Sequence, residues 1–312
     1  MSRGRLARPP LPMRDGVSAS CVGLPTEDHW PTIADFLIAR FTAIAPEAWM
    51  RRIRDGEVVD EHGVPVTPER RYQAPLRVFY YRALDTEPAI PFEEQVLYRD
   101  EHLLVVDKPH FVPVTPTGKY LHHSLLVRLK RKLGIEALSP LHRIDRSTAG
   151  LLLFSLRPET RGAYQTMFAQ RTVHKAYEAI VPLPGGDAAA AAAALPSVYR
   201  SRLVDDAHFM QVKEAPGEPN SETGIAVLKV FDGLAHLALS PVTGRRHQLR
   251  VHCMALGMPI VNDPFYPVLT PVDSDDFERP LQLLARSIAF TDPLTGEPRR
   301  FDSQLRLLLA PR

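Results

Sequence analysis

The segment Leu141-His142-Arg143-Ile144-Asp145-Arg146-Ser147-Thr148-Ala149-Gly150 runs directly into the apolar stretch Leu151-Leu152-Leu153-Phe154. The apolar stretch predicts a buried strand. Asp145 stands just before this strand, with arginines close to it on both sides. Guanidinium groups keep a nearby carboxylate ionised, and an ionised carboxylate can act as a nucleophile or as a base. The segment therefore predicts either a catalytic aspartate or a structural ion pair at the end of a strand.

The sequence around this segment is dense in strand patterns, with helical patterns between them. Strands are predicted at residues 95–98, 103–107, 150–156, 176–182, 224–231 and 235–240. Asp232-Gly233 joins the last two strands and is a strong hairpin signal. Helices are predicted over 125–133 and around 160–170 and 246–256. Many antiparallel strands with scattered helices predict an α+β domain over residues 89–312, built on a mixed, mostly antiparallel sheet.

The first 88 residues have a different character. Residues 1–28 are rich in Arg, Pro, Gly and Ser without periodicity, so we expect a flexible basic arm. Helical patterns follow at 32–41 and 46–54, and short strand patterns at 57–60 and 76–81. Residues 29–88 are therefore expected to form a small α+β module.

The composition is that of a soluble globular protein. Of the 312 residues, 45% are hydrophobic and 24% are charged, which excludes wholesale disorder, a coiled coil and a collagen. No apolar run approaches the ~18 residues of a membrane span, and the N-terminus lacks the apolar core of a secretory signal. Cys21 and Cys253 are too few for a disulfide framework. We expect a cytoplasmic protein without a membrane partner.

The net charge of +2 hides one strongly basic part of the chain. From Lys108 to Lys175, 12 Lys and Arg stand against 3 Asp and Glu, a net charge of 12 − 3 = +9. Such a segment is typical of a protein with a polyanionic partner. A solvated basic face has the same composition and remains the alternative.

A second segment of interest is His174-Lys175-Ala176-Tyr177-Glu178-Ala179. If it is a strand, Lys175 and Tyr177 share a face, because side chains alternate along a strand. The tyrosine would then offer a ring that can stack on a base and a hydroxyl that can donate a hydrogen bond. An ordinary amphipathic strand is the alternative.

A third segment is Thr243-Gly244-Arg245-Arg246-His247-Gln248-Leu249-Arg250-Val251-His252. Three arginines within six residues open a predicted helix, where backbone N–H groups also favour anions. On a helix, Arg250 would share a face with Arg246 and with His247. A basic surface helix is the alternative.

Together the three segments resemble the RluA-type pseudouridine synthase family. The family signature H-R-[LI]-D-x-x-T-[SA]-G fits residues 142–150 without a gap, and its K-x-Y motif falls on Lys175 and Tyr177. Its third motif, T-G-R-x-H-Q-[LI]-R-x-H, falls on residues 243–252. The resemblance covers about residues 95–305, with the motifs in the family's order.

Two departures from the family pattern affect the substrate loops. Arg246 stands where the family often has a small residue. The stretch that reads G-D-x-x-Y-G in the family is Asn262-Asp263-Pro264-Phe265-Tyr266-Pro267 here. These departures leave the expected chemistry unchanged.

The resemblance implies an isomerase that converts uridines of RNA to pseudouridine. Asp145 is then the catalytic aspartate, Arg250 pairs with it, and Tyr177 packs on the target base. Arg143 is implied to help displace that base from the RNA. Further substrate-binding residues are implied at His142, Lys175, Arg245, His247 and Gln248.

The implied reaction breaks the N1–C1′ bond of uridine, turns the base and rejoins it through C5. It includes neither a redox step nor a hydrolysis, so we expect no cofactor and no metal. His142 and Asp145 have no evident third partner for a metal site. The base must leave its stack before it can be reached.

Residues 29–88 resemble, more weakly, the small RNA-binding module of the small ribosomal subunit's protein four. The two helical patterns, Arg51–Val58 and the following hairpin carry this resemblance. The hairpin reads Asp60-Glu61-His62-Gly63, where the module usually has Val-Asn-Gly. The module often precedes a catalytic domain of this type.

The expected partner is therefore structured RNA, either rRNA of the large subunit or tRNA, with no DNA and a monomeric protein. One alternative is a catalytically idle RNA-binding or RNA chaperone protein on the same fold. The intact Asp145, Tyr177 and Arg250 argue against it. A hydrolase that uses Asp145 with a bound metal is a second alternative, and the lack of further clustered Asp and His argues against it.

Overall fold

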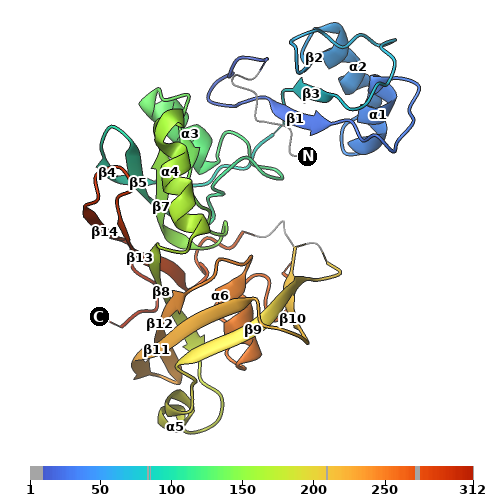
Figure 1. The fold of residues 1–312 in the computed structure, drawn as a ribbon. Coiled ribbons are helices and arrows are strands. Elements are labelled where there is room, and N and C mark those ends of the chain that lie inside the picture. Colours follow the sequence, from blue (N-terminus) through green and yellow to red (C-terminus); the bar gives the residue numbers. More distant parts are fainter. Residues whose placement is uncertain (1–9, 83, 85, 209, 271–274, 312) are drawn as a thin grey trace. The chain divides into compact units, whose positions relative to one another are not determined.

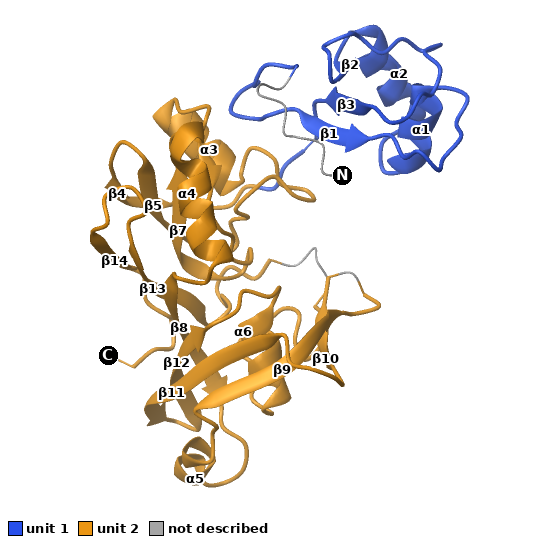
Figure 2. Ribbon diagram, in the orientation of Figure 1, with its two compact units in different colours: residues 1–88 blue, residues 89–312 orange. Residues whose placement is uncertain are grey.

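The computed structural model describes residues 10–82, 84, 86–208, 210–270 and 275–311. The chain divides into two compact units, residues 1–88 and residues 89–312 (Figure 2). Each unit has hydrophobic clusters of its own. Within the described ranges, no helix is long and apolar enough to cross a bilayer.

The first unit packs two helices on a three-stranded antiparallel sheet (Figure 1). Its elements are β1 (Ser20–Gly23), α1 (Ile33–Arg40), α2 (Pro46–Arg54), β2 (Val58–Asp60) and β3 (Arg77–Tyr80), with strand order β1-β3-β2. Thr32 caps α1, because its hydroxyl accepts a hydrogen bond from the Asp35 amide while the Asp35 carboxylate accepts one from the Thr32 amide. Trp49 lies fully buried between the helices and the sheet.

Residues 17–24 contradict the predicted flexible arm over residues 1–28. β1 pairs antiparallel with β3, and the flanking side chains of Val17 and Leu24 are buried, with 5% and 4% of their surface exposed. A four-residue strand held by its neighbours carries no periodic signal of its own, so the Arg-, Pro-, Gly- and Ser-rich composition around it misled the prediction. The first nine residues of the predicted arm lie outside the described residues.

The second unit is built on one large sheet. Its strands are β4 (Gln95–Arg99), β5 (Leu103–Lys108), β6 (Ser139–Pro140), β7 (Ala149–Ser155), β8 (His174–Pro182), β9 (Val198–Asp205), β10 (Val212–Ala215), β11 (Ser221–Phe231), β12 (Leu234–Pro241), β13 (Leu283–Thr291) and β14 (Pro298–Asp302). The strand order is β10-β9-β11-β12-β8-β13-β7-β5-β4, with β14 on β13 and β6 on β7. The predicted α+β class with a mixed, mostly antiparallel sheet is confirmed.

The middle of this sheet is β13, which pairs antiparallel with β8 and parallel with β7. The parallel pairing brings Gly150 against Ala285. Gly150 has φ +108°, and a Cβ on it would collide with the backbone of Ala285. Only glycine fits both this conformation and this approach, which explains the glycine that ends the 142–150 segment.

Four helices complete the second unit: α3 (Leu125–Leu133), α4 (Pro158–Ala169), α5 (Ala188–Ala193) and α6 (Gln248–Ala255). α3 and α4 pack against alternate residues of β5 and β7, so they cover opposite faces of that part of the sheet. This double cover accounts for the complete burial of β7, whose sequence is apolar almost throughout. α6 packs against β8, β12 and β13 in the other half of the sheet.

Candidate active site

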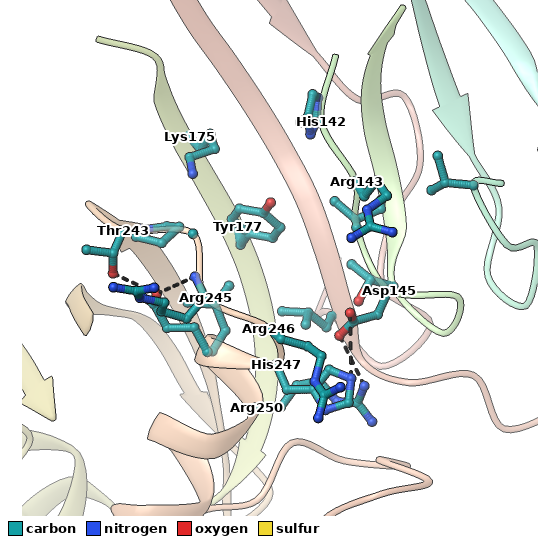
Figure 3. Close-up of a pocket in the computed structure, with 18 of the residues that line it drawn as sticks. His142, Arg143, Asp145, Lys175, Tyr177, Thr243, Arg245, Arg246, His247 and Arg250 are labelled. Atoms are coloured by element: carbon teal, nitrogen blue, oxygen red, sulfur yellow. Dashed lines mark hydrogen bonds and ion pairs between the residues drawn. The ribbon is translucent and has the colours of Figure 1, made fainter. Parts of the chain in front are cut away.

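A cavity of about 740 Å³ lies on the sheet face that carries α4 and α6. Its wall comes mainly from three segments: residues 142–148 before β7, the start of β8, and residues 241–250 before and within α6. All nine site residues predicted from the sequence line it: His142, Arg143, Asp145, Lys175, Tyr177, Arg245, His247, Gln248 and Arg250. Figure 3 shows the lining side chains gathered around the hollow, with the predicted site residues except Gln248 labelled.

The cavity is strongly basic. Its described wall holds seven cations and a single carboxylate, that of Asp145. The cations are Arg143, Arg146, Arg171, Lys175, Arg245, Arg246 and Arg250. A concave surface with one sign of charge concentrates ligands of the opposite sign. The cavity therefore suits a polyanion whose reacting part reaches a lone carboxylate.

Asp145 and Arg250 meet inside this cavity (Figure 3). Nη1 of Arg250 donates to Oδ2 of Asp145 at 3.1 Å, and Nε2 of His247 lies 3.8 Å from Oδ1. The Asp145 side chain keeps 28% of its surface exposed, whereas that of Arg250 keeps 1%. Burial alone would raise the pKa of the Asp145 carboxyl, but the Arg250 guanidinium and the His247 ring outweigh it and lower the pKa below its ordinary value. The carboxylate is thus ionised and open to a ligand.

Arg250 has a second carboxylate partner on its other side. Its Nε donates to Oδ2 of Asp263 at 2.8 Å, and its Nη2 donates to Oδ1 of the same group. The guanidinium carbon also lies 4.7 Å from the centre of the Phe265 ring and 5.4 Å from that of Tyr266. Arg250 is therefore held by two carboxylates and two aromatic rings, which leaves it little freedom.

The segment before α6 differs from the prediction. His247 has φ +53° and α6 begins at Gln248, so Arg245 and Arg246 precede the helix instead of opening it. Both arginines are exposed and bond to backbone carbonyls: Arg245 to Asn220, and Arg246 to Gln211. They project from a turn at the cavity edge, and the expected sharing of a helical face by Arg246 and Arg250 is wrong.

Gln248 lines the cavity, but its amide is fully occupied within the protein. Its Nε2 donates to the Glu222 carbonyl and to the Thr223 hydroxyl. Its Oε1 accepts from the Thr243 hydroxyl and from the Arg245 amide. Two donors and two acceptors exhaust the amide, so Gln248 fixes the turn on β11, and its predicted role in binding substrate is not supported.

Lys175 and Tyr177 share one face of β8, as the strand pattern predicts, and both point into the cavity (Figure 3). Neither the Lys175 ammonium nor the Tyr177 hydroxyl has a partner among the described residues. Burial lowers the pKa of Lys175 and raises that of Tyr177, the latter with help from the Asp145 charge. Tyr177 therefore keeps its proton and presents both its ring and a free hydroxyl donor.

His142 and Arg143 occupy the opposite wall and differ sharply. The His142 ring stacks on Phe168 at 4.9 Å, and its Nε2 accepts from the Leu153 amide at 3.2 Å. Burial and the Lys175 charge lower the pKa of His142 to about 3, so it is neutral at pH 7. Arg143 is exposed and its side chain has no partner in the described part of the chain. Arg143, unlike His142, is therefore free to hold an anion.

The loop that carries Asp145 is fixed from below by residues that the sequence analysis did not single out. Lys108, fully buried, donates from Nζ to the Arg146 carbonyl at 3.0 Å, and His110 donates from Nδ1 to the Ser147 carbonyl. The Arg146 guanidinium pairs with Asp275. Arg146, although next to Asp145 in sequence, therefore pairs with Asp275. The ion pair of Asp145 is made instead by Arg250, which is distant in sequence.

The sequence analysis assigned no role to two further residues. Arg171 lines the cavity at the turn after α4, with φ +59° and no side-chain partner among the described residues. Its only sequence signal was membership of the basic part of the chain. Asp263 was visible in the departure from the G-D-x-x-Y-G pattern. The Asn262 before it has φ +60°, a conformation that Asn tolerates better than other non-glycine residues.

The described side chains around the cavity do not form a metal centre. In the ranges that the structure describes, no three His, Cys, Asp or Glu side chains gather closely enough to hold a metal ion. Asp145 has a cation and a histidine as its neighbours, and the pKa of that histidine is lowered, chiefly by burial, to about 4. The site can therefore offer an ionised carboxylate, a hydroxyl, a stacking ring and several free cations.

Known proteins are similar to this chain in sequence. A sequence model of the RNA pseudouridylate synthase family matches residues 102–255. An uncharacterised RNA pseudouridine synthase of Synechocystis is 30% identical over 233 residues, which cover 74% of this chain and 78% of that protein. The ribosomal large subunit pseudouridine synthase C of Pasteurella multocida is 31% identical over 293 residues, covering 88% and 86%. The dual-specificity RNA pseudouridine synthase RluA of Haemophilus influenzae is 31% identical over 226 residues, covering 67% and 92%.

A solved structure shares the fold. Human RNA pseudouridylate synthase domain containing 1 superposes with a TM-score of 0.54 at 24% identity, covering 72% of this chain and 94% of the human one. The catalytic type expected from the three sequence segments is thus confirmed. By sequence and by fold, this chain belongs to the RNA pseudouridylate synthase family, as an enzyme of the RluA type.

Proposed function

We propose that this enzyme isomerises specific uridines of structured RNA, with Asp145 as the catalytic carboxylate and with the target base displaced from its stack into the cavity. The observation that carries the proposal is the lone Asp145 carboxylate, ionised, partly exposed and paired with Arg250 inside a cavity that is otherwise cationic. RNA supplies the polyanion that such a wall attracts.

The cavity wall supplies what the reaction needs from the protein. A displaced base loses stacking worth a few kcal/mol, and stacking on an aromatic side chain returns about 1–3 kcal/mol. Tyr177 offers the ring for this purpose. Arg143 is free to hold a phosphate or to occupy the space that the base leaves. Asp145 then attacks the sugar or the base, or removes a sugar proton, while the N1–C1′ bond breaks. C1′ bonds to C5, C5 gives up its proton, N1 takes up a proton, and Asp145 is released unchanged.

The RNA classes to test come from the names of similar proteins. The Pasteurella protein is named for the large ribosomal subunit, and a Saccharomyces cerevisiae protein that is 28% identical over 243 residues is named for tRNA. Large-subunit rRNA and tRNA are therefore the substrates we propose for this chain. We further propose that the protein acts as a cytoplasmic monomer.

The decisive experiment compares the wild-type protein with Asp145→Asn on transcribed rRNA and tRNA, without added metal, and maps pseudouridine at single-nucleotide resolution. The asparagine keeps the size of the side chain and removes its charge. We expect the variant to bind RNA with a Kd within about twofold of wild type, and to turn over at less than about one-thousandth of its rate, as removal of a nucleophile or base requires.

Two outcomes would contradict the proposal. A wild-type protein that binds the RNAs and forms no pseudouridine would be an idle RNA-binding protein. Turnover by Asp145→Asn above about one-thousandth of wild type would show that another group performs the reaction.

A further inference from the structure

Arg146, the residue directly after Asp145, has a side chain that is held by two groups beside the cavity. Its Nη1 donates to Oδ1 of Asp275 at 2.9 Å, and its Nη2 donates to Oδ2 of the same carboxylate, a two-pronged geometry that fixes the position and the plane of a guanidinium. Nη2 also donates to the Tyr120 hydroxyl at 2.9 Å, and the guanidinium carbon lies 4.7 Å from the centre of the Tyr120 ring. The Arg146 side chain is thus held in one orientation.

Tyr120 completes this network. Its hydroxyl donates to Oδ2 of Asp275 at 2.8 Å, so the arginine, the carboxylate and the hydroxyl each bond to the other two. Burial and the hydrogen bond to Asp275 raise the pKa of Tyr120 to about 12, so the hydroxyl keeps its proton. Tyr120 is buried, and its backbone amide and carbonyl both bond to Thr117, which lines the cavity. The three side chains of Arg146, Asp275 and Tyr120 form a closed set, the Arg146 tether.

The Asp275 end of the tether is anchored in the hydrophobic core. Phe277, two residues further on, packs edge-on against Phe92 and Phe111, with 5.5 Å and 5.1 Å between ring centres. Burial alone would raise the pKa of the Asp275 carboxyl, but its hydrogen-bond donors outweigh burial and lower the pKa, so the carboxylate is ionised at neutral pH. The tether therefore joins Arg146 to a segment that packs into the core through its own side chains.

The backbone around Asp145 is held as well, but its carboxylate is not. The Arg146 carbonyl accepts from the buried Lys108 ammonium at 3.0 Å, and the Asp145 carbonyl accepts from the Thr148 amide at 3.1 Å. Within the described structure the Asp145 carboxylate accepts one hydrogen bond, from Arg250 at 3.1 Å. The direction in which the carboxylate points therefore depends on how firmly its own loop is held, and the tether is the side-chain network nearest to it in sequence.

We propose that Arg146 is a positioning residue for the isomerisation: Asp275 and Tyr120 hold its side chain, and Arg146 in turn fixes the loop that presents Asp145 to the target nucleotide. The inference rests on the proposed role of Asp145. Without the tether the guanidinium would also be free to pair with the neighbouring Asp145 carboxylate and to cover it. Asp275 thus serves the reaction from outside the described cavity wall.

Arg299 provides a matched control, because it makes the same kinds of contact away from Asp145. Its Nη1 donates to the Tyr98 hydroxyl at 3.1 Å, its guanidinium carbon lies 5.7 Å from the centre of the Tyr98 ring, and it pairs with Asp292 at 3.5 Å. Its side chain is 24% exposed, close to the 27% of Arg146. Arg299 does not belong to the described wall of the cavity. Arg299→Gln therefore removes a comparable structural contribution without touching the site.

The experiment measures the single-turnover rate at saturating RNA, the RNA Kd and the Tm for Arg146→Gln, Asp275→Ala, their double variant and Arg299→Gln. We expect each single tether variant to lose at least about tenfold in rate, because a misplacement of roughly 1 Å costs about 100-fold. The double variant should lose no more than the larger single loss, since Asp275 acts through Arg146. Arg299→Gln should lose a comparable amount of Tm and less than about threefold in rate.

Three results would overturn the inference. The first is a rate loss in either tether variant that is no greater than that of Arg299→Gln. The second is a pair of losses that multiply in the double variant, which would separate Asp275 from Arg146. The third is a wild-type rate in Asp275→Ala together with tighter RNA binding, which would show that Asp275 only withholds Arg146 from the phosphates.

Should Arg146→Gln or Asp275→Ala fail to fold, Arg146→Lys decides the question. Lysine keeps the charge and loses the planar fork that bonds Asp275 and Tyr120 at once, so we expect about a tenfold loss of rate. A wild-type rate in Arg146→Lys would overturn the inference. Wild type and Asp145→Asn are measured alongside: an inactive wild type or an active Asp145→Asn defeats the proposed function, whereas failure in the tether variants alone defeats only this inference.

Discussion

Asp145 and Arg250 lie 105 residues apart in the chain and meet through a single hydrogen bond of 3.1 Å. Asp145 comes from the loop before β7, and Arg250 from the first turn of α6. The two elements belong to different halves of the large sheet. The pair therefore exists only when both halves are folded and correctly joined.

Arg250→Lys tests the geometry of this pair. Lysine keeps the charge and loses the planar fork that contacts Asp145 and Asp263 at once. We expect the rate at saturating RNA to fall at least about 100-fold. Arg200→Lys is the control, because Arg200 makes an exposed pair with Glu222, and such pairs contribute little. A lysine variant as active as wild type would show that the fork has no catalytic role.

Tyr177→Phe separates the ring from the hydroxyl. The hydroxyl has no partner in the described protein, so the variant should keep its Tm and, by stacking, its RNA affinity. We expect turnover to drop strongly, by about tenfold or more, because the donor that faces the base is gone. Tyr199→Phe is the control, because the Tyr199 hydroxyl donates to Glu214 outside the cavity. Equal activity of Tyr177→Phe and wild type would mean that the site needs only the ring.

Arg171→Gln tests whether the unpaired arginine at the cavity edge contacts a phosphate. Loss of one such contact should weaken binding and reduce the slope of log K against log salt by roughly 0.7–0.9. Arg157, at the other end of α4, pairs with Glu101 outside the cavity, so Arg157→Gln should leave the slope unchanged. The measurement is the Kd at three salt concentrations. Identical slopes for the two variants would remove Arg171 from the RNA-binding surface.

Buried histidines should make the protein less stable in acid. The pKa of His142 is lowered by burial and by Lys175 to about 3, whereas in the unfolded chain it is about 6.5. Between these values the unfolded chain binds a proton that the native protein does not, so the free energy of unfolding falls as the pH falls. Each such histidine contributes up to about 1.4 kcal/mol per pH unit. His110, His247 and His252, with pKa values of about 4, add to the effect.

His142→Gln should reduce this pH dependence, because the glutamine can accept the same backbone hydrogen bond without titrating. Urea unfolding at pH 6.5, 5.5 and 4.5 gives the change in the free energy of unfolding per pH unit. We expect this change to be smaller in the variant than in wild type, by up to about 1.4 kcal/mol per pH unit. The exposed His174 supplies the control as His174→Gln. If His142→Gln left the pH dependence of the free energy of unfolding unchanged, the His142 ring would have to be exposed to solvent.

A chain that begins at Pro88 tests the first unit. Residues 89–312 contain their own sheet and the whole cavity wall, so we expect this chain to fold and to modify a small stem-loop at saturating concentration. If residues 29–88 contact RNA, as their resemblance to a ribosomal module suggests, full-length RNA should bind more weakly and with a shallower salt slope. A well-folded truncation with the wild-type slope would exclude RNA contacts by the first unit.

The sequence was most informative where the chemistry is local. The apolar 151–154 stretch predicted β7 because both faces of that strand are covered. The spacing of Lys175 and Tyr177 predicted their shared face because β8 is regular there. The hairpin at Asp232-Gly233 was equally predictable, since both residues adopt the positive φ that its turn requires.

The rest depends on contacts that a single sequence does not display. β13 was missed because a bulge between Ala285 and Ser287 shifts its alternation, so the strand shows no steady period of two. The start of α6 was placed too early because His247 adopts a left-handed conformation in the folded turn. Asp263 could not be paired with Arg250, because only the folded loop brings the two together.

The position of β13 also determines how the two halves of the active site come together on folding. β13 starts at Leu283, and in the order of the described strands it alone joins the β4–β7 half of the sheet to the β8–β12 half. Without a paired β13, Asp145 and Arg250 therefore lie on two half-sheets that no described strand joins. The contact between Asp145 and Arg250 thus depends on the pairing of β13 with both β7 and β8.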